Sequence, residues 1–494
     1  MCKLKAIFII LFISLLLSDT LLAQTILELK DVVIISRTKN LTARRAYVLK
    51  KNAYWNWQIH KSNLRPQLRL DTQLLEFSRG VNPVIQSDGT YAIRTVNQNT
   101  SNASLALSQP IAAIGANVFV SSSLYRFDDI SNNNHAYSSQ PIQLGIQLPV
   151  FGFNHLKWDQ KIKPVEFLES KKQYDWNLEQ STYKAVGIFF QNLSDRHEWN
   201  MAQTNLEMNT ELFRISKEKF FNGQISKDEL LQVKLMMINA TKKSNAARVS
   251  MINSGLLLMT HLSLTEITDF TPVLPDLIPD FDITSGTAIN LALENNPESI
   301  AFKRRLLQAD QEVAYTKGNT GVSGNVNAAI GYASNFEKFS NWNQNISNHA
   351  VVQVGLSVPV IDWGRTYAAR KQVSMNRELV QTTVMQEKID FEKEIMGLVN
   401  IVMMLKENLE VVEQADSVSA QRYEIAHKRY LSGDISILEL NMAQKEKDNA
   451  SRDRLYTLWD FWRNYHQLRM ITLYDFISQT SLVSTLDQEI GSRN

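Results

Sequence analysis

The chain has 494 residues with 52 Lys and Arg against 50 Asp and Glu, a formal net charge of +2. This length is ample for a buried core and restricts the class little. Because the charge is spread without a basic block, the composition argues against a nucleic-acid partner held through a phosphate-binding patch.

The first 23 residues have the pattern of a secretory signal peptide. Lys3 and Lys5 precede an apolar run at 6–17, and a small-residue cleavage site follows at Ala23. The run is shorter than the roughly 18 to 20 residues of a spanning helix. Cleavage would remove Cys2, the only cysteine, so neither a lipid anchor nor a disulfide is expected in the mature chain. No later apolar run is long enough to span a membrane, so insertion would require a β-barrel.

Segments of alternating apolar and polar residues predict β-strands in two places. The first half has strands predicted at 66–77 and 140–151, and the second half at 322–334 and 349–361. Apolar residues on one face and small or polar residues on the other suit a barrel with lipid outside and water inside, although a soluble sandwich also alternates. The first half carries an insertion at 78–138 with further alternating segments. We expect an extra hairpin over or inside a barrel; the alternative is an added pair that makes six strands per chain.

Two spans without proline, 165–271 and 360–494, predict helices far longer than the globular norm. A continuous helix from about His155 to Asn222 would be roughly 100 Å long. The second span carries a heptad seam of the coiled-coil kind, formed by Leu398, Val402, Leu405, Leu409 and Val412.

Each long helix is interrupted by a glycine-containing segment, "KFFNGQISKDEL" and "RYLSGDISILEL". Gly223 and Gly433 permit the conformation that a helix reversal needs. Ser226 and Ser436 can cap the following helices, with Glu229 and Glu439 at the capping-box position three residues later. The glycine segments therefore predict helix turns near 223 and 433.

A shift of 210 residues without a gap aligns about 80 residues of the two halves, and a second shift of about 258 aligns the segments before them, which indicates a duplication with an insertion in the first half. The first shift superposes Gly145 on Gly355, Pro149 on Pro359, Gly187 on Gly397 and Gly223 on Gly433. The predicted organisation is a first repeat at 24–271, a linker at 272–284, a second repeat at 285–475 and a tail at 476–494.

These features together resemble the TolC-like outer membrane efflux protein family. The residues that carry the resemblance are the two glycine segments, with "LPVFGFN" (148–154) and "VPVIDWG" (358–364). The resemblance implies a mostly α fold with a β-barrel in the membrane. The protein would be a homotrimer in which each chain gives about four strands to a twelve-stranded barrel in outer membrane lipid. Long helices would continue the barrel as a coiled-coil tunnel across the periplasm.

The resemblance also implies the functional residues. The helix turns would dock a periplasmic adaptor protein that connects to an inner-membrane pump; their residues are Phe220, Gly223, Ile225, Ser226, Tyr430, Gly433, Ile435 and Ser436. Glu229 and Glu439 would be acids at the pore mouth or would only cap their helices, and Gln232 and Met442 stand where the family has further acids. The aromatic and apolar residues Phe220, Phe221, Tyr430 and Leu431 would pack the turns or meet the adaptor. The barrel-to-helix junction would contain Pro149, Pro359, Trp363 and Gly364.

No catalytic motif is found. The eight histidines have no helical metal-binding spacing, and no phosphate-binding loop occurs, so no enzyme activity, metal or cofactor is expected. The sequence predicts a passive outer membrane channel of a tripartite efflux or type I secretion system, located in the Gram-negative outer membrane and extending into the periplasm. The alternative is a structural or adhesive coiled-coil protein that does not conduct.

Overall fold

A computed structural model of the chain describes residues 25–86, 88–264, 270–275, 278, 280–342, 344 and 346–483. The predicted signal peptide and most of the predicted tail lie outside the described residues. The chain divides into two compact units, each with its own contacts. The helical unit consists of Met1–Lys50, Lys171–Ser299 and Ile389–Asn494, and the sheet unit of Lys51–Ser170 and Ile300–Lys388.

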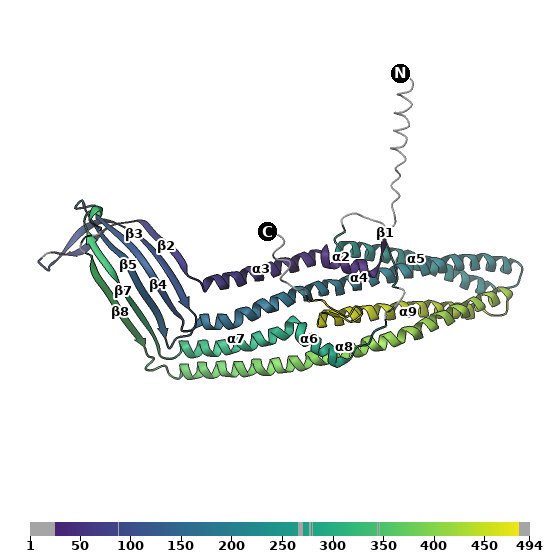
Figure 1. The fold of residues 1–494 in the computed structure, drawn as a ribbon. Coiled ribbons are helices and arrows are strands. Elements are labelled where there is room, and N and C mark those ends of the chain that lie inside the picture. The colour runs from purple at the N-terminus through teal and green to yellow at the C-terminus, as the bar shows by residue number, and fades with distance from the viewer. Residues whose placement is uncertain are drawn as a thin grey trace, which may run out of the picture. The chain divides into compact units, whose positions relative to one another are not determined.

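The sheet unit is built on one antiparallel sheet whose strands follow one another in chain order (Figure 1). Its six strands are β2 (Gln67–Ile85), β3 (Tyr91–Ile111), β4 (Ala116–Asp129), β5 (Asn134–Val150), β7 (Ser323–Phe336) and β8 (Ser347–Ser357). The expectation of four strands per chain is therefore wrong. The insertion at 78–138 provides β3 and β4, and it provides the start of β5.

The insertion joins the sheet because its apolar residues match those of the strand beside it. Leu105 of β3 pairs with Leu70 of β2 on one side and with Ser122 of β4 on the other. The apolar side chains of the insertion therefore extend the apolar face of the sheet instead of covering it. A hairpin lying over or inside the sheet, which we expected, would have left these pairings open.

The two faces of the sheet differ in polarity, as the alternation predicts. One face carries large apolar side chains that are exposed in the single chain, among them Leu68, Leu70, Leu144, Ile330, Val352 and Val354. The opposite face carries polar pairs, in which Asn102 donates to Gln73 at 3.2 Å and Ser121 donates to Gln143 at 3.4 Å. We call these the apolar face and the polar face.

The last strand ends earlier than predicted. Ser357 of β8 pairs with Ser323, the first residue of β7, so no partner remains for the residues that follow. Pro359 has no N–H group to continue a ladder. The strand expected at 349–361 therefore spans Ser347–Ser357.

The helices reach the lengths that the proline-free spans predict. They are α2 (Leu29–Thr38), α3 (Leu41–Asn63), α4 (His155–Phe221), α5 (Lys227–His261), α6 (Ser285–Asn295), α7 (Pro297–Asn319), α8 (Arg365–Ser432) and α9 (Ile437–Thr472). The predicted first long helix, 155–222, matches the 67-residue α4 to within one residue. None of the helices in the described part of the chain is both long and apolar enough to cross a membrane.

Polar contacts give the order of the four long helices in the helical unit. Asn192 of α4 donates to Ser254 of α5 at 3.0 Å, and Asn205 of α4 donates to Asp448 of α9 at 2.7 Å. Arg454 of α9 forms an ion pair with Glu413 of α8 at 3.5 Å. The order is therefore α5, α4, α9, α8, with α5 and α8 on the outside (Figure 1).

The core of the helical unit is aromatic and aliphatic. Phe189 and Phe190 of α4 pack in the same buried cluster as Phe461 and Tyr465 of α9. All five residues of the predicted heptad seam on α8 belong to this cluster or pack against it. Two very short pairings add to the unit: β1 (Thr25–Leu27) pairs in parallel with β6 (Phe270–Pro272), and β9 (Tyr474–Asp475) pairs with β10 (Thr480–Ser481).

Candidate functional site: the two helix turns

The turn between α4 and α5 has the hydrogen bonds of a Schellman motif. The Gly223 N–H donates to the Phe220 carbonyl at 3.0 Å, and the Gln224 N–H donates to the Lys219 carbonyl at 2.9 Å. These two bonds satisfy carbonyls in the last turn of a helix when the residue just after the helix has a left-handed backbone conformation. Gly223 has the required positive φ, 70°.

The turn between α8 and α9 repeats the motif. The Gly433 N–H donates to the Tyr430 carbonyl at 3.1 Å, and the Asp434 N–H donates to the Arg429 carbonyl at 2.9 Å. Gly433 has a φ of 85°. A Cβ at either glycine would meet nothing within 4 Å, so the backbone conformation alone selects glycine here.

Both returning helices begin with the predicted serine cap, but the two caps are unequal. The Ser226 hydroxyl accepts from the Glu229 N–H at 3.1 Å, and the Ser436 hydroxyl accepts from the Glu439 N–H at 3.3 Å. Only at the second turn does the glutamate complete a capping box, because Glu439 Oε2 accepts from the Ser436 N–H at 2.9 Å. Among the described residues, no hydrogen bond or ion pair engages the Glu229 carboxylate.

The two turns pack on each other through one apolar cluster. Leu212 of α4 and Val233 of α5 are buried together with Tyr430, Ile437 and other residues of the second turn. Tyr430 is only 4% exposed, so its side chain packs the turns. The Lys219 ammonium group lies over the Tyr430 ring at 5.3 Å and strengthens this contact.

Other residues near the turns remain on the surface. Phe221 is 75% exposed, and Leu431 occupies the equivalent position in the second turn and is also exposed. Phe220, Ile225 and Ile435 are partly buried. Each turn therefore presents one exposed apolar side chain beside a glycine backbone.

A buried polar pair lies between α4 and α9. Asp448 is 7% exposed, and its Oδ2 accepts the 2.7 Å hydrogen bond from Asn205. Burial raises the pKa of the Asp448 carboxyl above its ordinary value, because the charged form loses hydration. Burial likewise raises the pKa of Tyr423, in the apolar cluster, to about 12. No pattern in the sequence predicts the Asn205–Asp448 pair, since its members lie 243 residues apart.

The four predicted junction residues lie where the strands β5 and β8 lead into the long helices α4 and α8. Pro149 lies inside β5 and pairs with Asn325, whereas Pro359 lies beyond the end of β8. Trp363 is 95% exposed and has a φ of 54°, and Gly364 has a φ of 84°. The Gly364 N–H donates to Asp362 Oδ1 at 3.0 Å, so this segment forms the start of α8.

Within the described residues, no group of three or more His, Cys, Asp and Glu side chains could hold a metal ion. The arrangement at the turns instead offers fixed backbone geometry and exposed apolar side chains, which suit recognition of another protein.

Residues 288–457 match the model of the outer membrane efflux protein family. The chain carries an outer membrane efflux protein domain. This domain begins in α6 and ends in α9, so it includes the whole of the second helix turn. The resemblance inferred from the sequence is confirmed at this level. No curated protein matches the sequence.

Over about nine tenths of its length, the chain has the fold of solved outer membrane channels. The Campylobacter jejuni CmeC outer membrane channel has a TM-score of 0.65 at 15% identity, covering 90% of this chain and 85% of that one. A membrane protein from Pseudomonas aeruginosa has a TM-score of 0.66 at 14% identity, covering 94% and 95%. The Neisseria gonorrhoeae MtrE outer membrane channel, in its open state, has a TM-score of 0.59 at 13% identity, covering 90% and 88%. The match to the outer membrane efflux protein family thus lies within a chain that shares the protomer fold of these channels.

Proposed function

We propose that the chain is the outer membrane channel of a tripartite efflux or type I secretion system. It would act as a passive exit duct for substrates that an inner-membrane pump delivers through a periplasmic adaptor. The observation that carries the proposal is the outer membrane efflux protein domain within a channel fold. Two further features support it: the different polarity of the two faces of the sheet, and the exposed apolar side chains on the outer helices α5 and α8.

The sheet has the polarity of a membrane barrel wall. The apolar face would contact lipid, and the polar face, with residues such as Asn102 and Gln143, would line a water-filled interior. β2 and β8 are the two edge strands of the sheet, so each of them has a hydrogen-bonded neighbour on one side only. Other copies of the chain would have to pair with these two edges, because an open edge is not tolerated in lipid.

Three copies would close the wall. Three six-stranded sheets give eighteen strands in place of the twelve that the family resemblance implies. Barrels of about 16 to 18 strands leave an aqueous channel. The β3–β4 hairpin would therefore widen the pore of this channel within the membrane.

The outer helices of the helical unit carry the matching surfaces for assembly. On α5, exposed apolar side chains follow heptad spacing; they are Leu231, Leu235, Ile238, Val249, Ile252 and Leu256. On α8, exposed apolar side chains recur every seven residues, at Met404, Val411, Val418 and Ile425. Each stripe lies on an edge of the four-helix layer, so α5 of one copy would pack on α8 of the next.

The charges beside the two stripes are complementary. Between 230 and 260 the only charged residues are basic: Lys234, Lys242, Lys243 and Arg248. Between 407 and 424 on α8 there are five acidic residues and one arginine; the acids are Glu407, Glu410, Glu413, Asp416 and Glu424. Glu413 and Asp416 pair with Arg454 of α9, and Lys243 pairs with Glu198 of α4. The charges that remain for contacts between copies are Lys234, Lys242 and Arg248 on α5 and Glu407, Glu410 and Glu424 on α8. Opposite charges flanking an apolar seam select the partner and its orientation. A head-to-tail contact of this kind closes into a ring when the rotation between neighbouring copies divides a full turn, and for a homotrimer that rotation would be one third of a turn.

The helix turns would then form the periplasmic end of the duct, where the exposed Phe221 and Leu431 would meet the adaptor. Conductance of the purified protein in a planar lipid bilayer tests the proposal. We expect stepwise, long-lived conductance increments, with heat-denatured protein as the control. A stable trimer that gives no conductance under any voltage or salt would refute the channel and favour a structural coiled-coil protein.

A further inference from the structure

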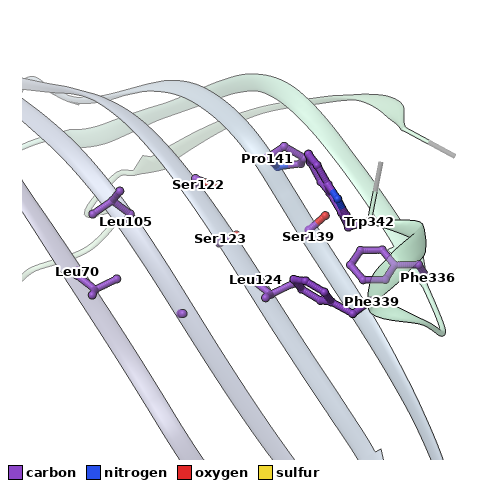
Figure 2. A pocket seen from close by; sticks show the side chains of 11 residues that line it. Leu70, Leu105, Ser122, Ser123, Leu124, Ser139, Pro141, Phe336, Phe339 and Trp342 are labelled. Atoms are coloured by element: carbon purple, nitrogen blue, oxygen red, sulfur yellow. The ribbon is translucent and has the colours of Figure 1, made fainter. Parts of the chain in front are cut away.

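A cavity of about 380 Å³ lies on the apolar face of the sheet. Its floor is formed by strands β2 to β5, with Leu70, Leu105 and Leu124 among the lining side chains, and the segment after β7 covers it with Phe339 and Trp342 (Figure 2). The volume falls in the range of roughly 300 to 1,000 Å³ that is typical of small-molecule sites. The cavity belongs entirely to the sheet unit.

A β-bulge and a row of small residues create the hollow. The β5–β7 register shifts between Ser139 and Ile142, at Pro141, which cannot donate to a ladder. The β4–β5 register shifts between Ser121 and Ser123, directly beside it. Small side chains on the floor at this point leave space between the large leucines.

The cover is held in place by its own contacts. The Ser334 hydroxyl donates to the Gln344 carbonyl at 2.6 Å, which fastens the β7–β8 segment to the end of the sheet. Tyr137 stacks on Phe336 with ring centroids 5.4 Å apart, and Phe339 meets the edges of both rings. These aromatic contacts form a wall where β7 ends and the segment toward β8 begins (Figure 1).

The cavity contains one polar group without a partner. Ser139 is 8% exposed, and its hydroxyl is buried and makes no hydrogen bond within the described structure. Figure 2 shows this oxygen directed toward Trp342. An unsatisfied buried hydroxyl costs about 1 to 3 kcal/mol, and a ligand that offers an acceptor would remove this cost.

We propose that the cavity binds one acyl chain of a membrane glycerophospholipid. The chain would lie along the leucines of the floor under Phe339 and Trp342, and its ester carbonyl would accept a hydrogen bond from Ser139. The lipid is the occupant because the cavity opens on the apolar face, where the exposed leucines and valines of the sheet require a hydrocarbon environment. This inference rests on the proposed location in the outer membrane.

Photolabelling of the reconstituted trimer tests the site. The probe is phosphatidylethanolamine with a diazirine in its acyl chain, and a diazirine hydrocarbon without an ester is the comparison probe. Mass spectrometry should find labelling by the phospholipid enriched at 336–342 relative to the rest of the apolar face. Ser122→Phe fills the floor and should reduce this labelling by about tenfold or more. Leu144→Phe, on the same face but outside the cavity, should leave it unchanged.

The serine hydroxyl has its own readout. Ser139→Ala should lower labelling by the phospholipid by about three- to tenfold and leave labelling by the hydrocarbon unchanged. Labelling at 336–342 that matches the rest of the face, or that Ser122→Phe does not reduce, in a trimer that conducts, would overturn the lipid site alone. Equal loss of both probes in Ser139→Ala would overturn the role of the ester. Labelling nowhere on the sheet, together with absent conductance, would overturn the proposed function as well.

Discussion

Replacing Gly433 by alanine isolates the energetic requirement of the second helix turn. Gly433 has a φ of 85°, and an added Cβ meets nothing within 4 Å. The substitution therefore introduces no collision, and its cost is that of a left-handed backbone in a residue with a side chain, about 1 to 2 kcal/mol. The turn should open more readily while the rest of the chain stays folded.

Hydrogen exchange of the purified protein, followed by mass spectrometry, measures this opening. Amides of residues 426–445 should exchange about five- to thirtyfold faster in Gly433→Ala. The matched control is Gly397→Ala, because Gly397 lies within α8 and its Cβ would also meet nothing within 4 Å. Alanine there should slow local exchange by about two- to fivefold, since glycine weakens a helix interior by about 0.5 to 1 kcal/mol. Unchanged exchange in Gly433→Ala, or a change of equal sign in both variants, would refute this account of the turn.

Three further predictions concern the caps, the buried seam and the outer helices. Ser436→Ala should lower the stability of its helix start by about 1 to 2 kcal/mol and Ser226→Ala by somewhat less, because only Ser436 belongs to a complete capping box. Hydrogen exchange at the first turns of α9 and α5 measures the two effects. A larger loss of stability in Ser226→Ala would contradict the assignment of the capping box. Burial raises the pKa of the Asp448 carboxyl in the folded chain. The contribution of Asp448 to the free energy of unfolding is therefore complete below the ordinary carboxyl pKa and is lost as pH rises through the raised value. Asp448→Asn should therefore raise the thermal midpoint near neutral pH and flatten its dependence on acid pH, and a steeper pH dependence would count against this. Val418→Asp places a charge in the apolar stripe of α8 and should yield monomers by light scattering, whereas an intact trimer would exclude this stripe from the interface.

The long helices and their turns could be predicted because local residues determine them. A proline-free span allows a helix such as α8 to continue for 68 residues, and a glycine at a left-handed position followed by a serine cap gives each reversal. Every component of the turns at Gly223 and Gly433 lies within about ten residues of sequence. Local patterns of this kind determine the structure without reference to the rest of the chain.

The strand number could not be predicted in the same way. Alternation around Leu105 is equally compatible with a strand within the sheet and with a hairpin over it. Only the pairing of Leu105 with Leu70 and Ser122 decides between them, and it depends on residues far apart in the chain. The cavity beside Ser139 depends likewise on two neighbouring register shifts, which no single strand sequence contains.

Duplication also predicted two equivalent turns, and the structure shows a difference that sequence alignment conceals. Both turns have a serine followed by a glutamate three residues later. The residues around them differ, however: Tyr430 is buried in the apolar cluster, whereas the equivalent Phe220 is only partly buried. A ring of such turns would therefore alternate between two kinds of surface, and its symmetry would be threefold and not sixfold.

The same difference decides which glutamate is available to act on a pore. The Glu439 carboxylate accepts hydrogen bonds from the Ser436 N–H and hydroxyl, so its charge is balanced at the start of α9. No contact in the described structure engages the Glu229 carboxylate in this way. Within the proposed channel, we therefore predict that Glu229→Gln lowers the ratio of cation to anion permeability, measured from reversal potentials under a salt gradient. Glu439→Gln is the matched control, because glutamine preserves a capping box while removing the charge, and it should change the ratio much less. A larger effect of Glu439→Gln would show that the second turn, and not the first, sets the charge of the pore mouth.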